Sequence, residues 1–204
     1  MKLNLPNQIT LARLVLAVVF FVLLAQFNLA APNTLLMDVC IILFVVAALT
    51  DILDGYLARK HNQVTAVGRV LDPFVDKVLV CGAFVFLAGA SFRTAGGVQA
   101  TGIHPWMVVI IIGRELLVTG LRGFSEARGI SFGANGFGKA KMLLQSVTAP
   151  VVMFFVAHVD HWPSWSAFLW FKPALVWVTV LVTALSMLPY VVHSKHILAE
   201  ADAA

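Results

Sequence analysis

Long apolar stretches alternate with short polar connections along almost the whole chain. Six such stretches cover residues 11–30, 35–50, 71–89, 106–121, 142–159 and 174–192. About 20 apolar residues in a helix cross the hydrocarbon core of a bilayer, and most of these stretches approach that length. The pattern therefore predicts an all-α protein with six transmembrane helices. The connections are short, so we expect residues 1–204 to form a single transmembrane domain.

The composition also indicates a membrane protein. Of the 204 residues, 60% are hydrophobic and 12% are charged, and the mean hydropathy is +0.92. Soluble domains carry about 25% charged residues, so we expect an integral membrane protein with no nucleic-acid partner. Cys40 and Cys81 both fall inside apolar stretches, which predicts buried thiols rather than a disulfide.

Basic residues are distributed unevenly between the two ends of the predicted helices. If the N-terminus is cytoplasmic, only Arg93 and Lys172 of the 14 lysines and arginines lie on the other side. Because cytoplasmic loops are enriched in Lys and Arg, we expect both termini and the acidic cluster described next to face the cytoplasm. The lack of an Arg/Ser-rich leader favours the plasma (inner) membrane of a bacterium.

Four aspartates gather where the second predicted helix meets the third: Asp51, Asp54, Asp72 and Asp76. Residues three or four apart share one face of a helix, so the two helices are expected to aim four carboxylates into one space. Two like charges ~5 Å apart repel by roughly 3 kcal/mol at an effective dielectric of ~20. A cluster with four negative charges is therefore expected to bind two divalent cations.

The chemistry of this cluster favours hard cations. Carboxylate oxygens suit Mg²⁺, Mn²⁺ or Ca²⁺, and we expect no Cys or His near enough to suggest zinc. Two such ions ~3.5–4 Å apart form a clamp for phosphoryl transfer. Gly55 and Gly68 lie on the same faces as the acids and are expected to admit a ligand to the backbone, with helix packing as the alternative role. Pro73 is expected either to open the third helix or to kink it.

The spacing of the whole region carries a family resemblance. It reads Asp51-x2-Asp54-Gly55-x2-Ala58-Arg59-x8-Gly68-x3-Asp72-x3-Asp76, which resembles the complete signature of the CDP-alcohol phosphotransferases. The resemblance implies a six-helix, dimeric membrane enzyme in which an alcohol hydroxyl displaces CMP from a CDP-linked substrate. It implies that the four aspartates hold two metal ions and that Asp76 is also the base. Gly55, Arg59 and Thr65 would contact the cytidine diphosphate.

Three further stretches indicate which alcohol is used. Residues 5–13, 113–122 and 138–145 resemble the phosphatidylglycerophosphate synthases, which join CDP-diacylglycerol and glycerol 3-phosphate. The pair Phe74-Val75 and the residue Met142 depart from the usual pattern. The resemblance also places Asn7 against the nucleotide, although Asn7 is equally well placed to cap the first helix.

The phosphate of glycerol 3-phosphate requires fixed cations. Four basic residues on the predicted cytoplasmic side are candidates: Arg114, Arg122, Lys139 and Lys141. Alternative roles remain open. Arg114 could form a buried ion pair with Glu115 that fixes helix packing, and Arg122 and Lys141 could be anchors that contact lipid headgroups.

These observations together predict a phosphatidyltransferase that uses two Mg²⁺ or Mn²⁺ ions and makes phosphatidylglycerol phosphate and CMP. The same chemistry with serine, inositol phosphate or phosphatidylglycerol as acceptor remains an alternative. A divalent-cation transporter is a rival from a different class, because four acids near a membrane could also form a transport site. It is disfavoured because the acids cluster near one face of the membrane instead of forming a path across it.

Overall fold

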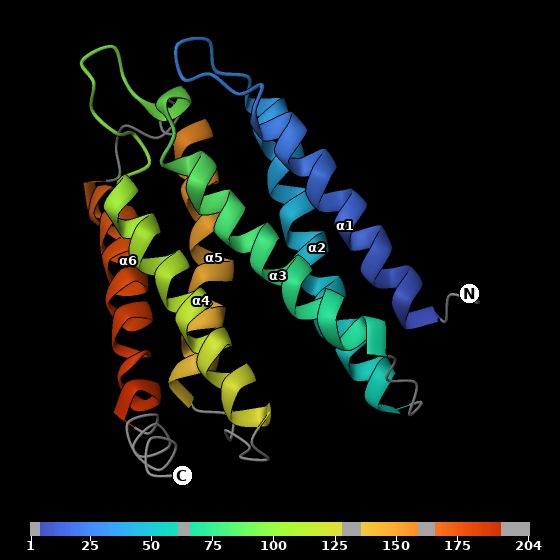
Figure 1. Ribbon diagram of the computed structural model, residues 1–204. Coiled ribbons are helices and arrows are strands. Elements are labelled where there is room, and N and C mark those ends of the chain that lie inside the picture. The colour runs from blue at the N-terminus through green and yellow to red at the C-terminus, as the bar shows by residue number, and fades with distance from the viewer. Residues whose placement is uncertain (1–4, 61–65, 128–135, 159–165, 193–204) are drawn as a thin grey trace.

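The computed structural model describes residues 5–60, 66–127, 136–158 and 166–192, which form a bundle of helices without strands (Figure 1). The helices in this part of the chain are α1 (Leu5–Leu24), α2 (Thr34–Lys60), α3 (Ala66–Leu87), the short 3₁₀ helix η1 (Ala90–Phe92), α4 (Pro105–Ala127), α5 (Gly136–His158) and α6 (Ser166–Leu185). The predicted all-helical class is confirmed, and each predicted apolar stretch overlaps one α-helix.

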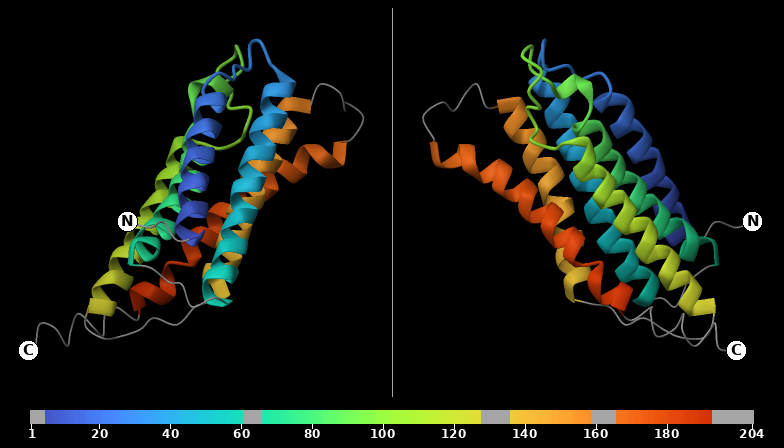
Figure 2. Two further views of the ribbon diagram at one scale, coloured as in Figure 1. Left: turned by 90° about the vertical axis from the view of Figure 1, so that its right-hand side faces the viewer. Right: turned by 60° about the vertical axis from the view of Figure 1, so that its left-hand side comes forward.

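Helix α3 lies at the centre of the bundle, because it contacts α1, α2, α4 and α5. Helix α1 packs on α2, α6 packs on α4 and α5, and α2 also contacts α5 directly (Figures 1 and 2). Successive helices run in opposite directions. The last turns of α2, α4 and α6 and the first turns of α3 and α5 therefore meet at one end, which we call the motif end because it carries the aspartate motif (Figure 2).

Several helix boundaries differ from the predicted apolar stretches. Helix α2 continues well past residue 50 to Lys60, because the Leu, Ala, Arg and Lys residues after the apolar run still favour helix. Helix α3 begins at Ala66, so Pro73 lies inside the helix and does not open it. Helix α6 begins at Ser166, before residue 174, and ends at Leu185. Hydrophobicity therefore located the helices but not their polar extensions.

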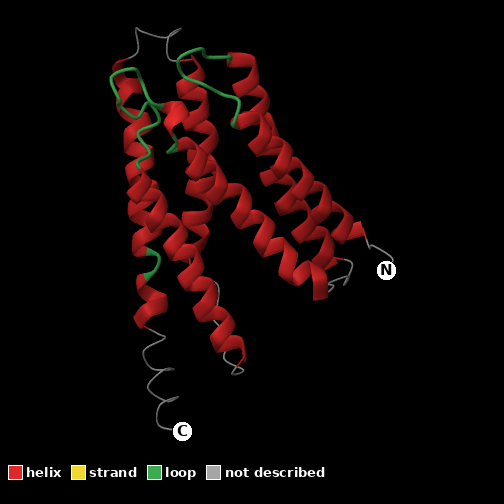
Figure 3. Ribbon diagram, turned by 45° about the horizontal axis from the view of Figure 1, so that its top comes forward, coloured by secondary structure: helices red, strands yellow, loops and turns green. Residues whose placement is uncertain are grey.

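Figure 3 shows the connections at the opposite end of the bundle as loops, and side-chain hydrogen bonds hold them to the helix ends. Asn33 begins α2, because its side-chain oxygen accepts a hydrogen bond from the Leu36 amide at 3.0 Å, the usual arrangement of an N-cap. Gln99 and Thr101 both donate to the Leu87 carbonyl at the end of α3, at 2.8 Å each. These bonds satisfy a backbone acceptor that the helix itself leaves unpaired.

The core between α1, α2 and α3 combines aliphatic side chains with several aromatic contacts. Phe20 and Phe44 are fully buried with ring centroids 5.7 Å apart, and Phe21 stacks on Phe86 at 5.5 Å. Gly82 makes this packing close, because a Cβ at that position would lie 2.3 Å from the Phe21 ring. The predicted buried thiols are also free, with Cys40 fully buried and Cys81 half-buried.

Two of the described helical segments are long and apolar enough to cross a membrane: Gly136–His158 and Trp170–Val192. Thr10–Leu24 and Thr34–Thr50 are shorter apolar helices. Large apolar side chains on α1, such as Leu11, Val15 and Val22, are about half exposed. An outward face of this kind suits contact with lipid, in agreement with a membrane protein, while the crossing of all six helices stays a prediction.

Candidate functional site

The predicted acidic cluster belongs to two helices that meet at the motif end. Asp51 and Asp54 lie in the C-terminal half of α2, and Asp72 and Asp76 lie in the first half of α3. The two helices contact each other, so the fold brings the two halves of the motif to one region. The side chains of Asp51, Asp54 and Asp72 lie outside the described part of the structure. The four-carboxylate metal site therefore stays a prediction.

The predicted nucleotide contacts fall in the same region. Asn7 lies on α1, Gly55 and Arg59 on α2, and Gly68 on α3. Their surroundings lie outside the described part of the structure, as does residue Thr65 altogether. The helix positions place α1, α2 and α3 at the motif end (Figure 1), which is where these residues would have to meet.

Asp76 is the described member of the acidic cluster. It is half-buried and lines a cavity of about 10 Å³ together with Lys77, Val80, Cys81, Glu115, Lys141, Met142 and Gln145. That volume holds about one water molecule. Cys81 borders this cavity because α3 runs along it, and the expectation that no Cys or His lies near enough to the acids to suggest zinc stays a prediction. Among residues whose side chains are described, no group of three or more potential metal ligands occurs.

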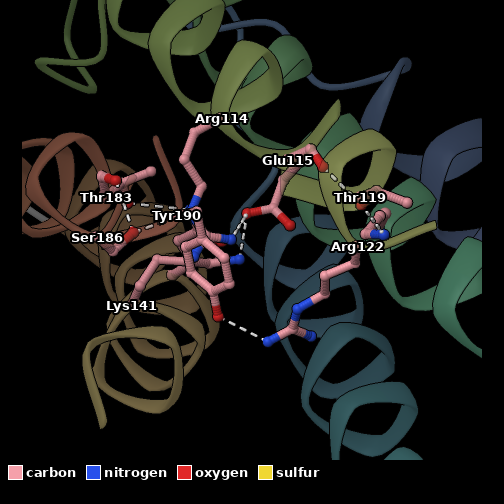
Figure 4. A network of polar contacts seen from close by, with 10 residues as sticks. Arg114, Glu115, Thr119, Arg122, Lys141, Thr183, Ser186 and Tyr190 are labelled. Atoms are coloured by element: carbon pink, nitrogen blue, oxygen red, sulfur yellow. Dashed lines mark hydrogen bonds and ion pairs between the residues drawn. The ribbon is translucent and has the colours of Figure 1, made fainter. Parts of the chain in front are cut away.

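Two of the four predicted basic residues contact Glu115, and the other two lie nearer the motif end. Arg114 and Glu115 on α4 and Lys141 on α5 are all buried. Lys141 donates to Oε1 of Glu115, and Nη1 of Arg114 reaches the same oxygen at 3.3 Å (Figure 4). The Arg114–Glu115 ion pair that the sequence offered as an alternative role is therefore present. Arg114 still has donors beyond this pair, since its Nε donates to the Ser186 hydroxyl at 2.9 Å.

Arg122 lies toward the end of α4. Nη2 of Arg122 donates to the Tyr190 hydroxyl at 2.6 Å, and Arg122 is half-buried. Its Nε is buried without a hydrogen-bond partner among the described residues. A buried N–H without a hydrogen-bond partner destabilises the folded protein by about 1–3 kcal/mol, the cost of removing the group from water. Binding of an acceptor at this N–H would offset that cost. Lys139, by contrast, is exposed at the start of α5.

The structure thus separates the four predicted phosphate ligands. Arg114 and Lys141 are buried and share the Glu115 carboxylate. Arg122 donates a hydrogen bond to the Tyr190 hydroxyl, and Lys139 is exposed on the surface. Among the described side chains of this region, two carboxylates (Glu115 and Asp76) lie with four cations (Lys77, Arg114, Arg122 and Lys141), so the region around Glu115 keeps an excess of positive charge. Such a region attracts an anion, and a phosphate is well matched to guanidinium donors.

Sequence reasoning missed several members of this network. Ser186, Tyr190 and Thr183 come from an apolar stretch that carried no motif, and Glu115 was considered only as a partner of Arg114. Gln145 donates to Thr183 at 3.1 Å, and Thr148 and Thr179 share a 2.6 Å hydrogen bond. The sequence feature that could have indicated these residues is the spacing of the hydroxyl residues at 179, 183 and 186, which places them on one face of a helix. Arg13 was also missed as a core residue, although it is 1% exposed.

Comparison with known proteins gives a consistent result. A family model described as CDP-alcohol phosphatidyltransferase matches residues 3–193. The CDP-diacylglycerol–glycerol-3-phosphate 3-phosphatidyltransferase of Bacillus subtilis (strain 168) is 36% identical over 192 residues, which cover 90% of this chain and 91% of the relative. A protein of the same name from Escherichia coli (strain K12) is 33% identical over 199 residues, which cover 93% and 94%. A third, from Rickettsia typhi, is 33% identical over 150 residues, covering 74% and 76%.

Proposed function

This chain belongs to the CDP-alcohol phosphatidyltransferase family, and we propose that it transfers a phosphatidyl group from CDP-diacylglycerol to glycerol 3-phosphate. The products are phosphatidylglycerol phosphate and CMP. The relatives named above carry this activity in their names, and two of them match at least nine-tenths of the chain. The observation that carries the proposal within the structure is the excess of basic side chains around Glu115, next to the cavity that Asp76 lines.

The aspartates are assigned to the metal and to the base. Asp51, Asp54, Asp72 and Asp76 would hold two divalent cations, Mg²⁺ or Mn²⁺, whose charge would stabilise the diphosphate of the lipid substrate and the departing CMP. The donor set consists of carboxylates, which fits these hard cations. The charge balance also fits, because four neighbouring carboxylates are stable only when cations neutralise them.

The transfer itself is a displacement at phosphorus. Asp76 would accept the proton of the C1 hydroxyl of glycerol 3-phosphate. The oxygen then forms a bond to the phosphorus that carries the diacylglycerol, and the bond from that phosphorus to the CMP oxygen breaks. Asn7, Gly55, Arg59, Thr65 and Gly68 would contact the CDP-diacylglycerol. Their positions on α1, α2, α3 and the connection between α2 and α3 are compatible with a ligand at the motif end.

The acceptor phosphate is assigned to the basic region. Arg122 and Lys139 lie toward the motif end of α4 and α5, and they would meet the phosphate first. Arg114 and Lys141 lie deeper, beside the Asp76 cavity. This order would place the phosphate on the basic residues and the C1 hydroxyl toward Asp76. An uncharged acceptor such as serine lacks the phosphate group that these side chains suit.

The membrane setting is part of the same proposal. The chain would form one domain in the plasma (inner) membrane, with both termini and the motif end in the cytoplasm, and it would act as a homodimer. Twelve of the 14 basic residues fall on the proposed cytoplasmic side, which supports this orientation. The lipid tails of the substrate would remain in the bilayer beside the helices.

Product analysis tests the activity directly. Purified protein is incubated with CDP-diacylglycerol, Mg²⁺ and an equimolar mixture of glycerol 3-phosphate, serine, inositol phosphate and phosphatidylglycerol, and the lipids are identified by mass spectrometry. We expect phosphatidylglycerol phosphate as the main product. A different phosphatidyl product would reassign the acceptor. Metal flux into proteoliposomes without CMP release would replace the enzyme assignment with a transporter.

A further inference from the structure

Tyr190 reaches the basic region through a break in the last helix. Helix α6 ends at Leu185, and a turn at Ser186 and Met187 precedes another helical segment that contains Tyr190. Pro189 accounts for the break, because proline lacks an N–H and its ring clashes with the carbonyl four residues earlier. The Ser186 amide still bonds to Val182 at 2.9 Å, whereas the Tyr190 amide bonds to Met187 at 3.1 Å.

The ring of Tyr190 lies against two guanidinium groups at once. The Cζ atoms of Arg114 and Arg122 are 5.7 Å and 5.2 Å from the ring centroid, within the range of a cation–π interaction. The hydroxyl accepts the 2.6 Å hydrogen bond from Arg122. Tyr190 is only 3% exposed, and Figure 4 shows its ring between the two arginines. One side chain therefore fixes the positions of both cations.

The start of α5 also lies close to Tyr190 and Arg114, at Gly138. A Cβ at position 138 would lie 3.7 Å from the Tyr190 hydroxyl and 4.0 Å from Nη2 of Arg114. These are ordinary van der Waals distances, so the start of α5 lies next to Arg114 and Tyr190, with Lys139 as the following residue. The same three elements, α4, α5 and the end of the α6 region, converge on one point of the bundle.

Two like charges on one ring are stable only with a counter-charge nearby. Glu115 supplies one negative charge, and it contacts Arg114 and Lys141. Arg122 has no carboxylate within ion-pairing distance in the described part of the chain, and its Nε is buried without a hydrogen-bond partner there. The arginine pair therefore keeps donors for an anion that carries more than one acceptor oxygen.

We propose that Tyr190 is a positioning residue that holds Arg114 and Arg122 as a pair for the phosphate of the acceptor alcohol. This inference rests on the proposed function and extends it to a residue of the apolar C-terminal stretch. Tyr190 acts through the two arginines, so its loss weakens binding of the phosphorylated acceptor. It has no part in binding the CDP-linked lipid, which the α1–α3 side of the motif end would hold.

The test compares Tyr190→Phe, which keeps the ring, with Tyr190→Leu, which removes it. We expect Tyr190→Phe to raise the KM for glycerol 3-phosphate by about tenfold, the factor that a hydrogen bond to a charged group contributes. Tyr190→Leu is expected to lower kcat/KM for the acceptor further, on the order of 30-fold, because the cation–π contacts are lost as well. The KM for CDP-diacylglycerol is expected to stay within about twofold in both variants.

Leu188→Ala is the matched control, because Leu188 lies in the same segment and is 53% exposed. It is expected to leave both KM values unchanged. Equal losses for both substrates in Tyr190→Phe, together with a lower melting temperature, would assign Tyr190 a structural role and overturn the inference. An unchanged acceptor KM in Tyr190→Leu would also overturn it.

The proposed function is tested separately by the wild-type protein. If the wild type transfers the phosphatidyl group to glycerol 3-phosphate and the Tyr190 variants have the same acceptor KM as the wild type, this inference is wrong and the proposed function stands. Absence of transfer to any phosphorylated acceptor by the wild type removes both.

Discussion

Lys141 on α5 forms an ion pair with Glu115 on α4, 26 residues earlier in the chain. Both side chains are more than nine-tenths buried. Oε1 of the same carboxylate also accepts a bond from Arg114. The contact ties α4 to α5 beside the cavity that Asp76 lines, so the predicted base and the predicted phosphate ligand Lys141 border the same cavity.

Removal of the Glu115 charge is expected to destabilise the protein. Glu115→Gln leaves two buried cations without their shared carboxylate, and breaking a buried pair in this way costs about 3–5 kcal/mol. We expect a clear fall in the melting temperature of the detergent-solubilised protein. Asp38→Asn is the control, because Asp38 pairs with His158 at 2.8 Å in a half-exposed site, where loss of the pair costs at most ~1 kcal/mol. Equal melting temperatures of Glu115→Gln and wild type would contradict the structural role.

Close packing at Gly82 gives a second prediction. A Cβ there would lie 2.3 Å from Cζ of Phe21, whose ring is held against Phe86. Gly82→Ala is therefore expected to lower stability by about 1–3 kcal/mol, as overpacked cores do. Gly113→Ala is the matched control in another helix, since a Cβ at Gly113 meets nothing within 4 Å. Adding Phe21→Leu should restore part of the loss. A neutral Gly82→Ala variant would show that α1 and α3 are less closely packed.

The sequence predicted the helices because the apolar pattern depends only on local composition. The family was also predictable, since the acidic and glycine positions have fixed spacing, and the comparisons confirm it. The extension of α2 to Lys60 was missed because helix formation continues after the apolar residues end. Hydropathy indicates which residues suit contact with lipid, but it does not indicate at which residue a helix ends.

The basic region was predictable only in part. Arg114 and Lys141 were visible because a charge in an apolar helix is costly and is retained for a reason. Their shared use of Glu115 depends on how α4 and α5 are placed against α3 and α6, which no local pattern encodes. Tyr190 was invisible for the same reason, because it lies 68 residues from Arg122 in the chain and meets it only after Pro189 breaks the helix.

The assignment of Asp76 as the base leads to a third prediction. Asp76→Asn removes the proton acceptor, so kcat for glycerol 3-phosphate is expected to fall by roughly 10²- to 10⁴-fold or more. Asp76 is half-buried, so the melting temperature is expected to change little. Initial rates of CMP release at saturating substrates measure the effect. Near-normal turnover of this variant would remove Asp76 from the reaction.

Metal removal distinguishes the base from the residues that only hold cations. We expect EDTA to abolish CMP release and either Mg²⁺ or Mn²⁺ to restore it, since four carboxylates favour these hard ions. Asp72→Asn removes one ligand and should raise the Mg²⁺ concentration for half-maximal activity by about tenfold or more, with partial recovery at high Mg²⁺. Asp76→Asn should not recover, because added metal does not replace a proton acceptor. Asp38→Asn, at the opposite end of the bundle, should keep the wild-type metal requirement. Full activity in EDTA, or an unchanged Mg²⁺ requirement of Asp72→Asn, would refute the carboxylate metal site.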